Sequence, residues 1–398
     1  MTPLRITLMG PFSVPSLADY LPPPVIRELP PGAGGAALVN LALARLQRGW
    51  PTDMITLDSA APPEGRRVEN GPLRLWVLPR RSRHAMRDFF REERTTLQRA
   101  LDEAKPDVCH AHWTFEYGLA AVTQAHHPAL VTLHDHAGHM LRWTGPRYLP
   151  LYTMSRRVLH TARCLTAVSP GVADYANAKS GRPVPVIPNC LSPDAARCLR
   201  TRPSAVLDVV GAWSWSSYRN ARRGLQAFAL FRARHPSSTL TLMGVGLEPG
   251  GPAETWARQE HLQEGVSFLG LPSWTETVTR LRNAAVVFHP ALEESFSLPV
   301  AEALAAGVPV VAARQASGPA WLVEQVRGGL LADGTREQAL ADALEEVATK
   351  TAEPTSAADA SARMLALCHS DTILAAYDRL YEDLLNQKPE LTTADGRR

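Results

Sequence analysis

Two glutamates, Glu294 and Glu302, carry the clearest chemical signal in this sequence. They lie eight positions apart in the stretch 284–313, which reads AAVVFHPALEESFSLPVAEALAAGVPVVAA. Carboxylates accept hydrogen bonds from sugar hydroxyls, whereas they repel an anionic group placed against them. The pair therefore suits a ligand with hydroxyl-rich groups at both ends. Either glutamate alone would indicate only a solvated side chain or a helix-start acid favoured by the helix dipole.

The residues around the glutamates predict a strand–loop–helix–strand unit with the apolar strands of a parallel sheet. Ser297 suits the N-cap of the helix, Pro299 its first position and Gly307 its C-cap, which places Glu302 in the first turn. In chain order the unit comprises a strand over Ala285–Phe288, a loop over His289–Phe296, a helix from Ser297 to Gly307 and a strand over Val308–Ala312.

The start of this helix also offers a place for phosphate. The free amides of Ser297 and Leu298 and the positive end of the helix dipole are expected to point into the crevice beside both glutamates. This geometry suits a phosphate on the amides, a sugar against Glu294 and a second polyol against Glu302. The expected ligand is therefore a nucleotide sugar, with a diphosphate between two hydroxyl-rich groups.

The stretch resembles the retaining glycosyltransferases of the GT4 type (glycosyl transferases group 1), which carry an E-x7-E motif. Glu294 and Glu302 fall on the two motif glutamates, and Phe296, Leu298 and the trailing EALAAGVPVVA agree with the surroundings of that motif. In the family, the first glutamate contacts the donor sugar and the second contacts the nucleotide ribose. The resemblance covers nearly the whole chain. It implies an α/β GT-B fold, in which two Rossmann-like domains with parallel sheets face each other across a cleft.

Arg219 and Asn220 resemble the family's lysine–asparagine pair, with arginine in place of lysine. They follow a predicted strand and the loop glycine Gly211. A cation at this position would neutralise charge on the diphosphate as the glycosidic bond breaks. Ala212 stands where many family members carry arginine, so the expected diphosphate clamp differs from the usual pattern at this point.

The N-terminal half resembles the family at two further places. Gly34 and Gly35 precede a predicted helix, where paired glycines of the family approach the donor phosphate and the acceptor. His134 follows a predicted strand over Ala129–Leu133, where a neutral imidazole can hydrogen-bond a sugar hydroxyl. The resemblance thus implies catalytic roles for Glu294, His134 and Arg219, and donor-binding roles for Glu302, Ser297, Leu298, Phe296, Asn220, Gly34, Gly35, Gly211 and Gly244.

A group of histidines indicates a different class of function, a metal-dependent hydrolase. The segments HAH at 110–112 and HDHAGH at 134–139 contain side chains of the kinds that bind zinc or manganese. Against this interpretation, each segment belongs to a separate βα unit, and no further set of metal ligands follows downstream. The candidate ligands are His110, His112, His134, Asp135, His136 and His139.

The segment 80–94, RRSRHAMRDFFREER, combines six arginines with Met86, Phe89 and Phe90. As a helix, it would place aromatic side chains beside basic ones and suit an anionic membrane surface. The simpler interpretation, which we favour, is a solvated arginine-rich helix whose phenylalanines pack into the core. Peripheral membrane contact is the second expectation.

Composition favours a two-domain globular protein. The chain has 398 residues, of which 45% are hydrophobic and 20% charged, and its net charge of +3 does not indicate a nucleic-acid partner. No apolar run approaches the roughly 20 residues that span a bilayer. The start MTPLRITLMG lacks a signal-peptide pattern, so we expect a cytoplasmic protein, with peripheral attachment to the cytoplasmic face of the membrane as the second expectation. Five cysteines without CxxC spacing indicate reduced thiols (Cys109, Cys164, Cys190, Cys198 and Cys368).

We expect an acceptor-side domain over 1–195, a donor-side domain over 203–370 and a helix over 371–386 that crosses back to the first domain. A polar linker over Pro193–Pro203 would join the domains, and the tail from Gln387 is expected to be disordered.

The predicted reaction is retaining transfer of a hexose-type sugar from a UDP- or GDP-linked donor, without a metal, to a glycan, lipid-linked or small-molecule hydroxyl. The hydrolase and a non-catalytic nucleotide-sugar-binding subunit stay as alternatives.

Overall fold

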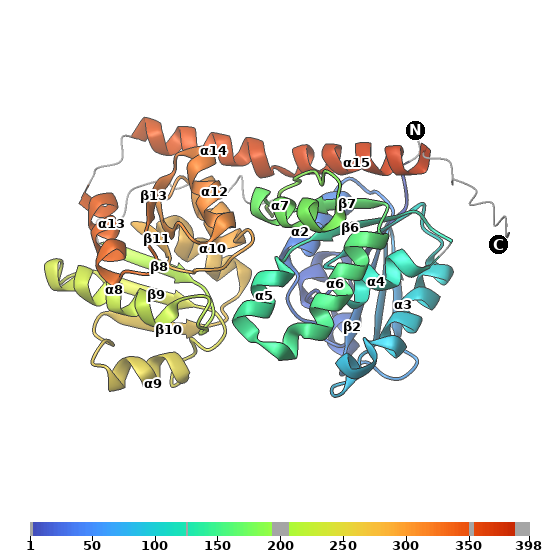
Figure 1. Cartoon of the computed structure of the whole chain (residues 1–398), viewed down its shortest axis with the longest axis horizontal. Coiled ribbons are helices and arrows are strands. Elements are labelled where there is room, and N and C mark those ends of the chain that lie inside the picture. Colours follow the sequence, from blue (N-terminus) through green and yellow to red (C-terminus); the bar gives the residue numbers. More distant parts are fainter. Residues whose placement is uncertain (1–2, 125, 193–206, 350–353, 387–398) are drawn as a thin grey trace. The chain divides into compact units, whose positions relative to one another are not determined.

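A computed structural model of the chain contains two sheets with helices packed around them (Figure 1). The structure describes residues 3–124, 126–192, 207–349 and 354–386. The predicted linker Pro193–Pro203 and the tail from Gln387 lie outside these residues. None of the helices formed by the described residues is both long enough and apolar enough to cross a membrane.

The first sheet has seven strands in the order β3-β4-β2-β1-β5-β6-β7. Strand β1 pairs in parallel with both β2 and β5, so Ile6 lies opposite Thr52 on one side and Val108 on the other. The edge strand β3 runs antiparallel to β4. All four residues of β1 are buried, as expected for a strand in the interior of such a sheet. The strands are β1 (Ile6–Met9), β2 (Thr52–Asp58), β3 (Arg66–Asn70), β4 (Leu73–Pro79), β5 (Val108–His112), β6 (Ala129–Leu133) and β7 (Cys164–Ala167).

The second sheet has six strands in the order β10-β9-β8-β11-β12-β13, and its neighbouring strands pair in parallel. Phe228 and Phe231 of α8 and Leu344 of α13 enter the apolar core on one face of this sheet. Helices α11 and α12 contact β12 without contributing to that core, so they cover the other face. The strands are β8 (Asp208–Ala212), β9 (Thr239–Met243), β10 (Val266–Gly270), β11 (Val286–His289), β12 (Val310–Ala313) and β13 (Gly329–Ala332).

The helices follow the strands in the alternating order typical of parallel sheets. The Pro-rich segment before Gly34 contains two short helices, η1 (Val14–Tyr20) and α1 (Pro23–Glu28). The other helices are α2 (Ala36–Leu46), η2 (Ala85–Asp88), α3 (Arg91–Ala104), α4 (Glu116–Thr123), α5 (Ala137–Thr144), η3 (Pro146–Tyr148), α6 (Leu149–Thr161), α7 (Pro170–Ser180), α8 (Ala221–Arg234), α9 (Pro252–Gln259), α10 (Trp274–Asn283), α11 (Leu298–Ala305), α12 (Ser317–Val326), α13 (Glu337–Thr349), α14 (Pro354–Cys368) and α15 (Ser370–Asn386).

The chain divides into two compact units. One comprises Met1–Thr132, Arg157–Leu165 and Leu374–Arg398, and the other comprises Leu133–Arg156 and Thr166–Ile373. The strands of the two sheets fall inside the predicted ranges 1–195 and 203–370, whereas the segment Leu133–Arg156 groups with the second sheet. Most of α15 belongs to the first unit.

The segment 80–94 is not one helix, contrary to both interpretations of its sequence. Helix η2 ends at Asp88 and α3 begins at Arg91. Between them, Phe89 and Phe90 adopt φ values of 54° and 56°. These left-handed conformations break the helix, and they are uncommon for bulky residues. Phe90 packs into the core as predicted, but Phe89 is exposed.

Candidate functional site

The loop between β11 and α11, which contains Glu294, is fixed by bonds to neighbouring segments. The amide of Glu293 donates to the carbonyl of Tyr218 at 3.2 Å, and the amide of Gly318 donates to the carbonyl of Glu294 at 3.1 Å. Gly318 packs so closely that a Cβ there would lie 2.3 Å from the carbonyl carbon of Ser295. These contacts set the backbone of the loop, and hence the direction of Glu294, from within the fold.

Arg219 binds the same loop through its guanidinium. Its Nη1 donates to the carbonyl oxygen of Glu293 at 2.8 Å and forms an ion pair with the carboxylate of Glu294. The guanidinium also lies 5.0 Å from the ring centroid of Tyr218. The fold therefore brings two predicted catalytic residues into contact from separate βα units. A guanidinium held this way has further donors for a diphosphate, and the carboxylate has further lone pairs for a sugar hydroxyl.

Helix α11 begins at Leu298 and is capped by Ser297 as predicted, since the Ser297 Oγ accepts from the amide of Val300 at 3.4 Å. Because the cap lies at Ser297, Pro299 is the second helical residue rather than the first. Glu302 was predicted in the first turn of the helix, but it lies just beyond that turn. Among the described residues, the amides of Ser297 and Leu298 have no acceptor. Both amides can therefore donate to an anion at the helix start.

Glu302 is buried, with 8% of its surface exposed, and its Oε1 accepts from the indole Nε1 of Trp274 at 3.3 Å. Burial raises the pKa of Glu302 to about 7, and the Trp274 hydrogen bond opposes that rise. Trp274 is the first residue of α10 and keeps 40% of its surface exposed. A carboxylate accepts about four hydrogen bonds, so Glu302 retains capacity for hydroxyl groups beside an exposed aromatic ring.

Trp274 is a residue that sequence reasoning missed. It precedes Glu302 by 28 positions, and only the packing of α10 against α11 brings the two side chains together. The available signal was a large aromatic residue directly after Ser273, a good N-cap, at the carboxyl end of a parallel strand.

The Asn220 side chain is occupied within the fold. Its Nδ2 donates to the carbonyls of Pro290 and Gly334 at 3.0 and 2.7 Å, and its Oδ1 accepts from Arg223 at 3.1 Å. These bonds join the start of α8 to the loop after β11 and to the segment after β13. They favour a role for Asn220 in positioning Arg219, while direct contact with the donor stays a prediction.

Two of the predicted donor-binding glycines make room for Trp213. A Cβ on Gly211 would lie 2.1 Å from the Trp213 ring, and one on Gly244 would lie 1.8 Å from its carbonyl oxygen. The buried indole packs edge-on against Phe288 at 5.7 Å between ring centroids. Trp213 is thus a core residue, and the two glycines shape the loop above β8.

Gly34 and Gly35 lie in the other compact unit, directly before α2. Gly35 has a φ of 67°, and a Cβ there would lie 1.8 Å from the carbonyl oxygen of Pro11, so any side chain would displace the turn. Gly34 also has a positive φ, but a Cβ there would meet nothing within 4 Å. Their predicted contact with donor phosphate stays a prediction.

His110 has a hydroxyl within hydrogen-bonding distance of each ring nitrogen. Its Nδ1 lies 2.8 Å from the hydroxyl of Tyr381, and its Nε2 lies 2.7 Å from the hydroxyl of Thr132. His134 is buried as well, and burial lowers its pKa to about 3, so the imidazole is neutral as predicted for its role. In the described part of the chain, no three His, Cys, Asp or Glu side chains are grouped so as to hold a metal ion.

His139 makes a second contact with the glutamate loop that the sequence did not reveal. Its Nδ1 lies 2.6 Å from Oε2 of Glu293, the neighbour of Glu294. The His139 ring stacks on His136 at 3.6 Å between centroids, and His136 stacks on Tyr175 at 4.0 Å. This stack fixes the imidazole against Glu293, whose pKa is raised by burial.

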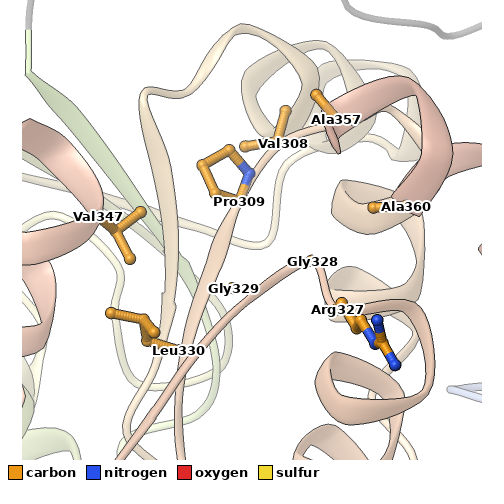
Figure 2. A pocket seen from close by; sticks show the side chains of 10 residues that line it. Val308, Pro309, Arg327, Gly328, Gly329, Leu330, Val347, Ala357 and Ala360 are labelled. Carbon is orange, nitrogen blue, oxygen red and sulfur yellow. The ribbon is translucent and has the colours of Figure 1, made fainter. Parts of the chain in front are cut away.

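A small pocket of about 150 Å³ lies away from these residues (Figure 2). Val308, Pro309, Leu330, Val347 and Ala360 give it a largely apolar lining, with Arg327 at its side. It lies at the amino ends of β12 and β13, whereas Glu294 and Arg219 follow the carboxyl ends of β11 and β8. Ligands of parallel sheets bind at the carboxyl ends, so we do not place the site in this pocket.

Comparison with known proteins agrees with this geometry. The model for glycosyl transferases group 1 matches residues 206–364, and the model for the glycosyl transferase 4-like domain matches residues 32–190. The chain belongs to the glycosyl transferases group 1 family. The six-stranded sheet and the glutamate loop lie within the first of these matches.

Curated relatives match parts of the chain. A glycogen synthase from Mycobacterium tuberculosis is 28% identical over 218 residues, which is 52% of this chain and 52% of that protein. A D-inositol 3-phosphate glycosyltransferase from Corynebacterium urealyticum is 36% identical over 129 residues, which is 31% of this chain and 30% of that protein. The chain thus matches about half the length of the first relative and less of the second.

Solved structures show that the fold is GT-B. Sucrose-phosphate synthase from Thermosynechococcus elongatus superposes with a TM-score of 0.74 at 19% identity, covering 96% of this chain and 99% of that one. The Anabaena protein HepE, solved in complex with UDP and glucose, superposes with a TM-score of 0.71 at 17% identity, covering 96% and 100%. The predicted fold class is confirmed.

Proposed function

We propose that this chain is a retaining glycosyltransferase that moves a hexose-type sugar from a UDP- or GDP-linked donor to a hydroxyl group. The acceptor would be a glycan, a lipid-linked sugar or a small molecule. The observation that carries this proposal is the contact between Arg219 and Glu294, in the loop that leads to the amides of Ser297 and Leu298, which have no acceptor among the described residues. It supplies a cation and helix amides for a diphosphate, next to a carboxylate for a sugar.

In the proposed reaction, the anomeric carbon forms a bond to the acceptor oxygen as its bond to the β-phosphate oxygen breaks, on the same face of the sugar. The departing phosphate oxygen takes the proton of the acceptor hydroxyl, so the products are a glycoside and a nucleoside diphosphate. Arg219 and the amides of Ser297 and Leu298 stabilise the charge on the leaving group without a metal ion. Glu294 orients the sugar, and Glu302 accepts from the ribose.

The relatives support this choice of donor and acceptor. HepE was solved with UDP and glucose, and the inositol-phosphate enzyme is named for a small polyol acceptor. We therefore propose UDP-glucose as the first donor to test. We place the reaction in the cytoplasm, where nucleotide sugars would be the available donors.

Donor hydrolysis without acceptor tests the proposal directly. We would incubate the chelator-treated full chain with UDP-α-glucose and follow the released sugar by NMR, repeating the assay with GDP-α-mannose. Retention predicts that the α-anomer of the free sugar appears first. The proposed absence of a metal ion predicts that activity survives the chelator. First release of the β-anomer would contradict retention. Nucleotide binding with no release, and with no transfer to a panel of acceptors, would instead support the non-catalytic subunit.

A further inference from the structure

The turn between η2 and α3 presents two apolar side chains to solvent. Met86 is 43% exposed and Phe89 is 41% exposed, whereas the adjacent Phe90 is only 4% exposed. The left-handed φ values of Phe89 and Phe90 point these neighbouring rings in different directions. Such conformations cost energy for bulky residues and persist only where the surroundings enforce them. The fold thus holds Phe89 outward beside Met86.

The carboxylates of this segment all contact the same arginine. Arg81 contacts Asp88 at 2.8 Å, Glu92 at 3.2 Å and Glu93 at 2.7 Å. The Arg81 hydrogen bonds lower the pKa of Asp88 to about 2, which is the direction expected for a carboxylate bound to a guanidinium. One guanidinium therefore contacts all three acidic side chains of the segment 80–94, which contains six arginines against these three acids.

The other arginines of the turn have no acidic partner among the residues that the structure describes. Arg83, Arg87 and Arg91 are exposed, and none of them forms an ion pair with a described residue. Arg94 donates to the carbonyl of Phe89 at 2.9 Å and likewise lacks a described carboxylate partner. Arg157 lies close enough to Arg94 to lower the pKa of Arg94, in addition to the effect of burial. Exposed arginines thus flank Met86 and Phe89 along the chain, and Arg94 contacts the backbone of Phe89.

We propose that Met86, Phe89 and the surrounding arginines form a docking surface for an anionic lipid bilayer. The apolar pair would enter the boundary between headgroups and acyl chains, and the arginines would contact the headgroup phosphates. An acidic polysaccharide or nucleic acid would satisfy the arginines and could stack on Phe89, but it would leave Met86 in water, whereas a bilayer accommodates both side chains. The surface shares no residue with the glutamate loop, so this inference does not depend on the proposed reaction.

Vesicle cosedimentation of the full chain tests the proposal. Vesicles of phosphatidylcholine would be compared with vesicles containing about 30% phosphatidylglycerol, at low and high salt. We expect binding to the anionic vesicles and loss of binding at high salt. Arg87→Glu with Arg91→Glu should lower the partition coefficient about 30-fold or more, because each surface arginine contributes roughly fivefold. Met86→Ser with Phe89→Ser should lower it about tenfold.

Matched controls separate a defined surface from general charge or apolarity. Arg27→Glu with Arg66→Glu makes the same change in net charge at exposed positions elsewhere, and Leu230→Ser with Leu385→Ser removes two similarly exposed apolar side chains. Both controls should bind like the unmodified chain, and Arg87→Lys with Arg91→Lys should retain binding. Absence of vesicle binding, equal loss in the controls, or binding to an anionic polysaccharide but not to vesicles would overturn the proposal.

Discussion

The histidines of the seven-stranded sheet and the glutamates of the six-stranded sheet use their hydrogen-bonding capacity differently. His110 has both ring nitrogens bonded, to Tyr381 and Thr132. Glu302 has one described partner, Trp274, for a group that accepts about four hydrogen bonds. His110 lies on β5 and Glu302 on α11, and both side chains are buried. The comparison shows that remaining bonding capacity, more than a local concentration of reactive side chains, marks the candidate site.

The largest expected effect is at Glu294. Replacing Glu294 with Gln should lower the rate of donor turnover about 100- to 1,000-fold, because it removes a charged partner of the sugar and of Arg219 in a preorganised loop. Binding of UDP alone should change little. The matched control is Glu324→Gln on the exposed side of α12, which should leave the rate unchanged. Near-normal turnover by Glu294→Gln would contradict the catalytic assignment.

The next effect concerns the pH dependence of stability at Glu302. Its pKa is raised from the ordinary 4.5 to about 7, so the folded chain binds this proton more tightly than the unfolded chain does. The unfolding free energy should therefore fall as pH rises from about 4.5 to 7, by an amount on the order of 3 kcal/mol. Glu302→Gln should remove this fall and make the protein more stable than the unmodified chain at pH 8, but not at pH 4. Denaturant unfolding measured at both pH values checks the prediction.

Tyr381 provides the contrasting test in the seven-stranded sheet. Tyr381→Phe leaves Nδ1 of the buried His110 without this partner, so we expect a loss of about 1–3 kcal/mol in unfolding free energy. Donor turnover at a temperature where the variant is folded should stay close to that of the unmodified chain. A variant of full stability that lost turnover would contradict the structural role that we assign to His110.

The smallest expected effect is at Trp274. Trp274→Phe keeps an aromatic ring but removes the N–H bonded to Glu302, and the pKa of Glu302 should rise further because this hydrogen bond lowers it. We expect donor KM to rise about three- to tenfold at pH 7, with kcat less affected, and the difference to shrink as pH increases. Trp143→Phe, at another exposed tryptophan, is the control. An unchanged KM at every pH would rule out this role.

Features set by local sequence were predicted from the chain, whereas features set by long-range contacts were not. The strand, loop and helix around Glu294 were predicted closely because their signals are local, namely an apolar strand, the Ser297 cap and the glycine after the helix. The contacts of Trp274 with Glu302 and of His139 with Glu293 join residues far apart in the chain, and no local pattern encodes them. The segment 80–94 was misjudged because the left-handed turn at Phe89 and Phe90 depends on its tertiary surroundings.

The central claim is that a nucleotide sugar binds at the start of α11. A thermal-shift screen of the chelator-treated full chain against UDP, GDP, ADP, TDP and their common sugar conjugates tests it most directly. A ligand at 100 times its Kd adds about 2.7 kcal/mol to the unfolding free energy, so the account predicts a clear rise in Tm with one nucleotide and a smaller rise for Glu302→Gln. No rise with any nucleotide, together with a large rise on adding zinc or manganese, would contradict the account and favour the histidine cluster.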